Sequence, residues 1–435
     1  HVTAVEMRDP QNISAVVALD TRTNETRRFN GKFFVDSTGH AYVGAMAGAE
    51  HTLRESDHLG MSNMWRWADA GAPQQFPQTP WALNMEMEDF PYPQRFHGQW
   101  FWESGFNKHP IYGLEDTRDW NLRAVYGAFN AMKNKGGMDK HQNAKLEWIA
   151  YIGGTRESRQ LVGDVLLTKE DITEKRMFPD GTVPTTWDID LHYPKEQYAQ
   201  KFPQDPFISK AVFGKGVDRK HGYPVPYRSF YSKNIENLFM AGRNVSVTHE
   251  ALGTVRVMKT GGMIGEVVGK AASICVKNEC TPRAVYERYL SELKELLRLP
   301  GAARRVTLTS PIQLPEGYQP LPPPKDLAEM AAAIIPAAQL KGLVLDDTKA
   351  KLSGNWTEGE NLAGYVGEGY RYRGPKDNGA ARFEFQVETP GTYEVRLTYG
   401  AHANRATNTP VSIESAEGSK NATVNQRLAP PVDKH

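Results

Sequence analysis

The first fifty residues alternate between short apolar runs and polar turns. Residues 16–19 form an apolar run, residues 20–25 carry turn residues, and residues 26–29 return as a second strand. A further apolar run at 32–36 stops at the small, glycine-containing turn 37–40. A buried strand that ends at such a turn is a common nucleotide-contact arrangement in α/β folds.

From about residue 51 to 230 the pattern is irregular and rich in aromatic residues. Six of the nine tryptophans fall between Trp65 and Trp120. Such a stretch suits an inserted cap domain that lines a substrate cavity. The alternative, which we favour for each tryptophan taken singly, is that these side chains pack in a core.

Residues 235–300 have the pattern of an ordinary α/β segment. A strand at 237–242 closes on a glycine, and a helix is expected from about 254 to 277. Gly261, Gly265 and Gly269 share one face of that helix, with Gly262 beside them. Because glycine costs roughly 1 kcal/mol in a helix interior, we expect close contact there with a sheet, another helix or a bulky ligand.

The last third of the chain changes character. A proline-rich connection at 299–324 predicts an extended linker, and a short helix is expected at 328–340. Residues 381–387 and 392–399 alternate with period two around the turn Pro390-Gly391. This pattern predicts a hairpin of a small antiparallel β domain.

Composition narrows the classes of function. The 435 residues include 52 basic and 51 acidic side chains, which gives no reason to expect nucleic acid or an anionic membrane as partner. No apolar run approaches the ~18 residues of a membrane span, and the first residues carry no signal core, so the chain is expected to begin inside a longer protein.

Cysteine and histidine spacing argues against a metal centre. Two cysteines, Cys275 and Cys280, cannot supply a four-cysteine cluster; a disulfide between them and a pair of buried thiols both stay open. The twelve histidines show no metal-binding spacing on a helix. We therefore predict no metal site.

The stretch around residues 237–256 carries the strongest chemical signal. Gly242 at a strand end lets a backbone approach a ligand closely. A helix that starts at Gly253 and Thr254 would offer unpaired N–H groups and the positive end of its dipole. That combination suits a phosphate, or the N1/C2=O edge of a reduced flavin where negative charge develops.

Catalytic candidates lie within this stretch and before it. His249 could accept a proton during hydride removal, or it could be a loop histidine with a structural hydrogen bond. Arg256 could stabilise an anionic reduced flavin or substrate, or form an ordinary salt bridge. Asp190 and His192 share a strand face and could orient a substrate hydroxyl.

A further charged group, Arg156, Glu157 and Arg159, falls on an expected helix. For this group we favour a structural ion-pair network.

The segment NLFMAGRNVSVTHEALGTVRVMKTGGMIGEVVGKAA resembles the C-terminal flavin-contacting segment of the FAD-dependent oxidoreductase family, which includes the heterodisulfide reductase A-like proteins. FVDSTGHAYVGAMAGAE resembles its second nucleotide-contact motif, with Ser37 and His40 in place of alanine and aspartate. VYGAFNAMKN, RESRQLVGDVLLTKEDI and YPVPYRSFYSKNIENLFMAGR resemble the cap and its return. The resemblance covers about residues 1–295.

The resemblance implies FAD as cofactor and a set of contacts. Thr38 and Gly39 would lie near the ADP portion, and Gly242, Arg243 and Asn244 near the ribityl–pyrophosphate region. A helix start at Gly253, Thr254, Val255 and Arg256 would point at the isoalloxazine. The family's opening Gly-x-Gly-x-x-Gly unit is not found in the sequence, so binding of FAD by this chain alone is open.

The tail resembles the golvesin/Xly-type carbohydrate-binding-like domain. The shared features include Trp356, Tyr365, the turn at 390–395 and the stretch 404–411. The resemblance implies an extracytoplasmic location, periplasmic or secreted. Its aromatic residues could stack on a sugar or pack in a β core.

These observations together predict an α/β FAD-binding fold, N-terminally incomplete, with an inserted α+β cap and a C-terminal antiparallel β-sandwich-like domain. The expected divisions are 1–50 and 231–300 for the FAD-binding domain, 51–230 for the cap, 301–340 for a linker with a short helix, and 341–435 for the tail domain. The expected function is hydride removal from an organic substrate, with a carbohydrate as one candidate, onto flavin N5.

Two alternatives remain open from the sequence. The first is a non-catalytic carbohydrate-binding or scaffold protein that keeps the fold without the cofactor. The second, a redox relay, is disfavoured because the chain has two cysteines and no cluster motif. The predicted catalytic residues are His249, Arg256 and His192. The expected partner is a small-molecule or carbohydrate substrate; the oligomeric state is not predicted.

Overall fold

In the computed structural model, the apolar runs near the N-terminus form an antiparallel meander in the order β1-β2-β3. Its strands are β1 (Val2–Asp9), β2 (Asn12–Asp20) and β3 (Glu25–Asn30). Ala18 pairs with Arg27 and Asp20 with Glu25, so the polar turn lies between the two strands as the sequence predicts.

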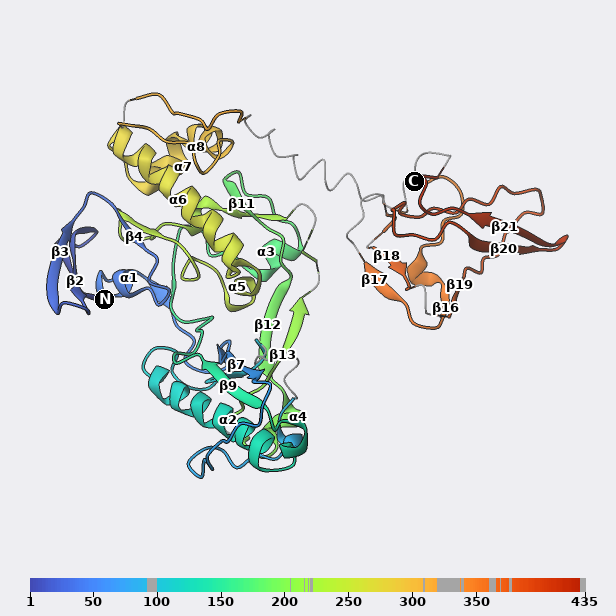
Figure 1. Cartoon of the computed structure of the whole chain (residues 1–435). Coiled ribbons are helices and arrows are strands. Elements are labelled where there is room, and N and C mark those ends of the chain that lie inside the picture. Colours follow the sequence, from blue (N-terminus) through green and yellow to red (C-terminus); the bar gives the residue numbers. More distant parts are fainter. Residues whose placement is uncertain are drawn as a thin grey trace. The chain divides into compact units, whose positions relative to one another are not determined.

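The structure describes residues 1–435 apart from 92–99, 204, 215, 218, 220–221, 308–309, 319–336, 338–339, 360–364, 368, 375–377 and 431–435. The chain divides into two units, His1–Leu321 and Pro322–His435 (Figure 1). The predicted proline run at 322–324 and the predicted helix at 328–340 lie outside the described residues, apart from positions 337 and 340.

The first unit contains a pair of short parallel strands. β4 (Phe34–Asp36) pairs with β15 (Leu238–Met240), although about two hundred residues separate them in the chain. All three residues of β15 are fully buried. A short helix, α1 (Tyr42–Met46), follows β4. Both predicted strands are therefore present, and the turns that end them lie at the same edge of the pair.

The cap has a hydrophobic core of its own. It is built on α2 (Leu114–Asn134) and on the antiparallel pair β7 (Trp65–Asp69) and β9 (Ala144–Ile149), which lie together in the lower part of the first unit (Figure 1). Trp65 and Trp102 are fully buried in this core, and Trp67 is nearly so. Trp81 and Trp100 are about half exposed. Trp65, Trp67 and Trp102 therefore pack in a core, as we favoured for each tryptophan taken singly.

Smaller elements complete the cap and its connections. They are β5 (His51–Thr52) paired with β10 (Gln160–Leu161), β6 (Met61–Ser62) paired with β8 (Glu103–Ser104), the short helix α4 (Glu196–Ala199), and the 3-10 turns η1 (Met87–Asp89) and η2 (Met138–Lys140).

The first unit also contains two further antiparallel pairs and a group of helices. The pairs are β11 (Gly181–Thr185) with β14 (Tyr223–Pro226), and β12 (Ile189–Pro194) with β13 (Ser209–Gly214). The helices are α3 (Lys169–Thr173), α5 (His249–Val255), α6 (Met258–Asn278), α7 (Pro282–Arg288) and α8 (Leu290–Leu297), with the 3-10 turn η3 (Tyr227–Ser229) before β15. Cys275 and Cys280 are both buried, free thiols.

The second unit consists of antiparallel strand pairs. β16 (Lys351–Ser353) pairs with β19 (Ala380–Arg382), β17 (Thr357–Gly359) with β18 (Tyr370–Tyr372), and β20 (Thr409–Ser415) with β21 (Gly418–Val424). A 3-10 turn, η5 (Asp347–Lys349), precedes them.

The predicted hairpin at 381–399 does not form. β19 ends at Arg382, and no strand is found among residues 383–408. The apolar side chains of both runs, such as Phe385 and Tyr393, are about half exposed. Alternation favours a strand only when the apolar face is covered, and the described neighbours do not cover this one.

Candidate functional site

The turn after β4 is organised by the buried carboxylate of Asp36. It accepts hydrogen bonds from the backbone N–H of Thr38 at 3.0 Å and of Gly44 at 2.8 Å, and from the Thr38 hydroxyl at 2.7 Å. The Thr38 oxygen in turn accepts from the N–H of Tyr42 at 2.9 Å. The Thr38 side chain therefore shapes the turn, and the backbone is what the turn offers to a ligand.

Gly39 and Gly242 bring the two strand ends together. Gly39 has φ of 77°, and the guanidinium of Arg243 occupies the place that a side chain at Gly39 would need. Gly242 has φ of 89°, and the Oδ1 atom of Asn244, at 3.8 Å, is the nearest atom that a Cβ there would meet. Both backbones are in the left-handed region that glycine adopts at little cost.

The corner around Gly39 carries positive charge without a counter-ion in the described part of the chain. Neither Arg159 nor Arg243 forms an ion pair there; Arg159 donates to the carbonyl oxygen of His40 at 3.2 Å. The Nε of Arg243 and the Oδ1 of Asn244 are buried and have no hydrogen-bond partner among the residues that the structure describes. Burial, and then the charges of Arg243 and Arg159, lower the pKa of His40 to about 4. This corner is electrostatically suited to an anion.

The first turn of α6 adjoins Gly242 and is open on its outer side. A Cβ at Gly261 would lie 3.9 Å from the Cα of Gly242. Met258, the first residue of α6, is 94% exposed. Side chains added at Gly262, Gly265 and Gly269 would meet no atom within 4 Å, so the expected contact of these glycines with a sheet or helix is not made by the described residues. The first N–H groups of a helix have no partner within the helix, and the exposure of Met258 leaves this helix start accessible.

The predicted helix start at Gly253 to Arg256 is wrong. Gly253, Thr254 and Val255 form the last turn of α5, Arg256 caps it, and the extended residue Val257 separates it from α6. The cause is packing against neighbouring strands. Thr254 is fully buried, and its hydroxyl lies 2.5 Å from the carbonyl oxygen of Trp187 and 2.8 Å from the hydroxyl of Thr185. A role of these residues in cofactor binding stays a prediction.

Residues 156–159 have no regular secondary structure and residue 160 begins β10, so the expected helix does not form. Their side chains reach different parts of the site in succession. Arg156 pairs with Glu103 of the cap, Ser158 donates to the carbonyl oxygen of Gly39 at 3.1 Å, and Gln160 donates to that of Arg243 at 2.7 Å. These contacts reach from the cap to the corner around Gly39.

Glu157, from the same segment, holds His249. The Nδ1 atom of His249 lies 2.9 and 2.8 Å from the two carboxylate oxygens of Glu157. Glu157 is 2% exposed and also accepts the backbone N–H of Leu59 at 2.9 Å. His249 is the first residue of α5, whose preceding residue, Thr248, caps the helix through the N–H of Ala251. Arg156, Glu157 and Arg159 therefore have three different partners, Glu103, His249 and His40, and do not pair with one another.

Asp190 and His192 lie together on β12, as their spacing predicts. The Nε2 of His192 is 3.1 Å from a carboxylate oxygen of Asp190, and its Nδ1 is 2.7 Å from Glu103, which is fully buried. Burial lowers the pKa of His192, and Asp190 opposes this shift. Trp100 packs its ring 5.0 Å from the imidazole, and the indole N–H of Trp187 donates to Asp190 at 3.2 Å.

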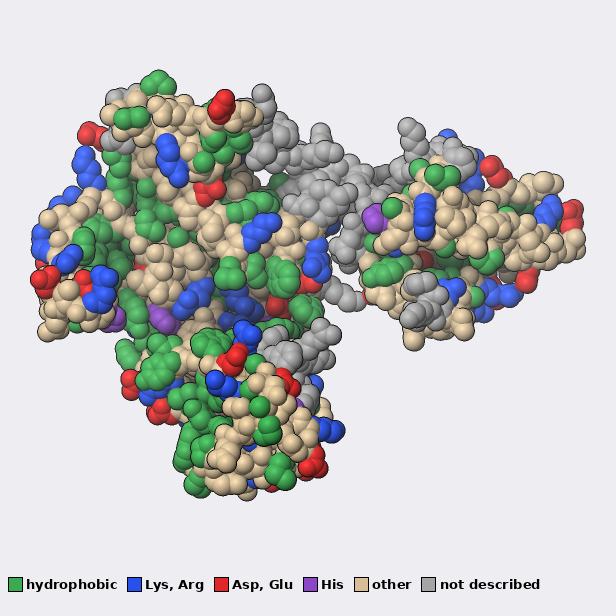
Figure 2. All heavy atoms as spheres, viewed as in Figure 1, with side chains coloured by type: hydrophobic (Ala, Val, Ile, Leu, Met, Phe, Trp, Pro, Cys, Tyr) green, Lys and Arg blue, Asp and Glu red, His purple; other side chains and the backbone are tan. Residues whose placement is uncertain are grey.

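Arg256 joins this cluster from the end of α5. Its guanidinium donates to the carbonyl oxygen of Asp190 at 3.0 Å and lies 3.9 Å from the carboxylate. Burial lowers the pKa of Arg256 as it does that of Arg156, and the two cations repel each other. Figure 2 shows blue side chains gathered at this level of the first unit, between its upper part and the cap.

The structure therefore brings the sequence candidates into two groups. Residues of the turns after β4 and β15 form the corner around Gly39, and residues of β12 and α5 form the cluster around His192. Glu103 and Trp100 were not among the predicted site residues, because nothing in their local pattern shows that β8 meets β12. Glu157 was a candidate, but its partner His249 could not be inferred from the sequence.

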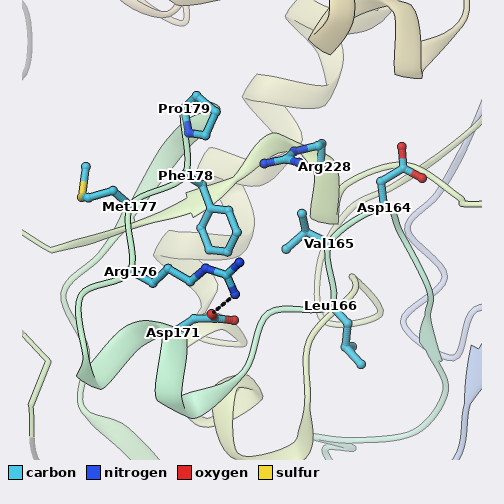
Figure 3. Close-up of a pocket in the computed structure, with 9 residues that line it drawn as sticks. All are labelled: Asp164, Val165, Leu166, Asp171, Arg176, Met177, Phe178, Pro179 and Arg228. Atoms are coloured by element: carbon cyan, nitrogen blue, oxygen red, sulfur yellow. Dashed lines mark hydrogen bonds and ion pairs between the residues drawn. The ribbon is translucent and has the colours of Figure 1, made fainter.

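A separate pocket of about 460 Å³ lies away from these groups (Figure 3). Its wall includes Phe178, with Arg176 beside the ring and pointing toward Asp171. The charges are paired within the protein: Arg176 with Asp171 at 3.2 Å, and Arg228 with Asp180 at 2.9 Å. It has no unpaired charge among these groups to attract an ionic ligand.

Residues 114–297 match the FAD dependent oxidoreductase family. This region holds Gly242, Arg243, His192, His249 and Arg256. The match supports a general flavin-dependent oxidoreductase role, and it does not single out the heterodisulfide reductase A-like proteins. Residues 343–430 match the Golvesin C-terminal domain, which hints at an extracellular location. No curated protein and no solved structure matches the chain.

The geometry of this FAD-dependent oxidoreductase region fits part of the cofactor. The buried, unpaired Nε of Arg243, the positive-φ glycines at 39 and 242, and the open first turn of α6 lie beside one another. An anionic group could take hydrogen bonds from all of them. Among the described helices none is long and apolar enough to cross a membrane, and the described residues hold no cluster of three or more metal-ligating side chains.

Proposed function

We propose that the chain is an FAD-dependent oxidoreductase that oxidises a hydroxyl-bearing carbon. The observation that carries the proposal is the open corner formed by Gly39, Gly242, Arg243 and the first turn of α6. Its unpaired guanidinium nitrogen and free backbone N–H groups call for an anionic ligand. The family match supports FAD as that ligand.

The chain's own residues divide the work. Arg159 and Arg243 balance the pyrophosphate charge, and the backbones of Gly39 and Gly242 allow close approach. The N-terminus of α6 favours negative charge beside it. When bound, FAD supplies the hydride acceptor, at flavin N5. His249 takes the proton of the substrate hydroxyl, while His192 and Arg256, both anchored on Asp190, orient the substrate.

A carbohydrate is the substrate class that the cluster around His192 favours. Trp100 and Trp187 are 46% and 41% exposed, and each contacts the His192–Asp190 pair. Aromatic faces beside buried carboxylates and guanidinium groups suit a ring with apolar C–H faces and several hydroxyls. The Golvesin C-terminal domain is consistent with a substrate outside the cell.

Binding of FAD can be tested by the colour of the purified protein. The protein, expressed from its complete coding sequence, is expected to be yellow and to release FAD on denaturation. Arg243→Gln should weaken FAD binding about tenfold or more, because a charge-assisted hydrogen bond of roughly 1.5–3 kcal/mol is lost. Arg66→Gln, which removes a surface pair with Glu147, is the control.

A colourless protein that takes up no FAD during dialysis would overturn the proposal. That result would favour the alternative of a carbohydrate-binding or scaffold protein that has kept the fold. An Arg243→Gln variant that binds FAD as tightly as the parent would still support a flavoprotein, but it would show that Arg243 does not contribute to FAD binding.

The substrate class can be tested by tryptophan replacement. Trp187→Ala is expected to raise KM for an oxidised sugar roughly tenfold, because stacking on an aromatic face contributes about 1 kcal/mol or more. Trp148→Ala is the matched control, since Trp148 is 53% exposed and has no contact with His192. Anaerobic bleaching of the flavin by a panel of methyl hexopyranosides gives the readout. Equal KM changes in both variants would argue against a sugar at this cluster.

The cellular location is a further part of the proposal. We infer an extracytoplasmic protein from the Golvesin C-terminal domain alone. Immunodetection in the periplasmic and culture fractions would support it, and detection in the cytoplasm alone would contradict it.

A further inference from the structure

His249 is held from one side only. Its Nδ1 atom contacts both oxygens of Glu157, at 2.9 and 2.8 Å. Within the described part of the chain, its Nε2 atom has no hydrogen-bond partner. The imidazole side chain is 9% exposed and that of Glu157 is 3% exposed, so the contact is largely shielded from water.

The partners of Glu157 fix where the proton of a neutral His249 must lie. A carboxylate only accepts hydrogen bonds, and Glu157 already accepts one from the N–H of Leu59 at 2.9 Å. Nδ1 must therefore be the donor toward Glu157. In the neutral imidazole the lone pair is then on Nε2, the nitrogen that has no protein partner.

His192 makes a different set of contacts. Its Nδ1 faces Glu103 at 2.7 Å and its Nε2 faces Asp190 at 3.1 Å. Both nitrogens are therefore engaged, and neither can take a substrate proton without losing a contact. His58 also has both nitrogens engaged, on the carbonyl oxygens of Leu59 and Lys108. His249 is thus the better proton acceptor of the three.

The pair lies between the two groups of site residues. Glu157 is flanked by Arg156, which pairs with Glu103, and by Ser158, which donates to Gly39. Glu157 is also close enough to Arg256 for its charge to act on that guanidinium. Glu157, which holds His249, therefore belongs to the segment that contacts both the corner around Gly39 and the cluster around His192.

We infer that Glu157 is a positioning residue: it holds His249 as the Nδ1–H tautomer, so that Nε2 accepts the substrate's hydroxyl proton. The inference rests on the proposed function. In the step, the substrate O–H bond breaks and an Nε2–H bond forms, giving an imidazolium whose Nδ1–H faces the carboxylate. The C–H bond breaks with its electron pair leaving to the flavin, and a carbonyl product remains.

Glu157→Gln separates positioning from simple packing. The glutamine has the same shape, and the N–H of Leu59 holds its amide oxygen at the Oε2 position, which places its NH₂ group at the Oε1 position, 2.9 Å from Nδ1. Two donors cannot share that contact, so the proton moves to Nε2 and the lone pair turns toward the amide. A misplaced tautomer of this kind lowers kcat by roughly 10³- to 10⁴-fold.

The tautomer can be observed directly. Protein labelled with ¹⁵N-histidine is examined by long-range ¹H–¹⁵N correlation near pH 8.5, with His249→Asn to assign the signal. We expect the Nδ1–H pattern in the parent protein and the Nε2–H pattern in Glu157→Gln. Glu103→Gln, the same substitution at the other buried glutamate–histidine pair, should leave the His249 signal unchanged.

The outcomes distinguish the inference from the proposed function. An Nε2–H pattern in the parent protein overturns the inference, and this measurement needs no variant of Glu157. An unchanged His249 pattern in a folded Glu157→Gln also overturns it. A correct tautomer in a protein that binds no flavin would leave the dyad in place and refute the proposed function. In active protein, a loss in kcat with unchanged KM supports positioning; a rise in KM alone contradicts it.

Discussion

At the scale of single residues, position 40 decides the charge of the corner that the FAD proposal uses. The related motif has an aspartate there, whereas this chain has His40. An aspartate beside Arg159 and Arg243 would neutralise part of their charge. A histidine whose pKa is lowered to about 4 stays neutral near pH 7 and leaves both guanidinium groups free for an anion.

His40 should also make the stability of the protein depend on pH. Its folded pKa, about 4, is below the unfolded value of 6.5. Between these values the unfolded chain binds the proton and the folded chain does not, so the free energy of unfolding falls as the pH is lowered. Because the ring is only part-buried, we expect a loss on the order of 1 kcal/mol between pH 7 and pH 4.5.

Urea unfolding at the two pH values measures this loss. His40→Gln should remove about that part of the pH dependence, and His51→Gln, at an exposed histidine of the same segment, should not. A His40→Gln protein with the same pH dependence as the parent would show that the ring is protonated without cost in the folded state.

At the scale of elements, the break between α5 and α6 places His249 and the α6 N-terminus at different parts of the site. The sequence predicts one helix from about 254. Val257 is extended instead, and it separates a seven-residue helix from a 21-residue one. Residue periodicity could not reveal this break, because it depends on Thr254 and Gly253 fitting against β11 and β12.

The cap of α5 should matter more for activity than for stability. Thr248→Ala removes the hydroxyl that accepts the N–H of Ala251, and is expected to cost about 1 kcal/mol in the free energy of unfolding. Because His249 is the next residue, kcat should fall as well. Denaturant unfolding and steady-state kinetics measure the two effects.

Thr281→Ala provides the matched comparison for that change. Thr281 caps α7 through the N–H of Ala284 at 3.3 Å and is equally part-buried. Its loss should reduce stability to a similar extent and leave kcat unchanged. A fall in kcat for both variants would mean that activity reports general loosening and not the position of His249.

At the scale of the whole molecule, the sequence predicts the secondary-structure elements better than the contacts between them. The meander, the strands at β4 and β15 and the aromatic cap core have patterns with one clear period or composition. The hairpin at 381–399 failed because its apolar face has no cover among the described residues. The site was predicted as residue types near Gly242; the joining of Glu103 to His192 and of Glu157 to His249 depends on distant segments that meet only in three dimensions.

The cap and the α/β part of the first unit have separate hydrophobic clusters, centred on Trp65 and Phe129 in one and on β15 and α6 in the other. Polar contacts of the site cross between them, including those of Arg156 and His192 with the cap residue Glu103. The cap can therefore vary its own packing while these few contacts preserve the arrangement of the site.

The run 156–160 limits which sequence changes the protein can accept during evolution. Its five consecutive side chains make different contacts, with Glu103, His249, Gly39, His40 and Arg243 as their respective partners. A replacement at one position disturbs one partnership, whereas inserting or deleting a single residue would give every side chain the wrong partner. We therefore expect homologues to accept substitutions in residues 156–160 far more readily than insertions or deletions there.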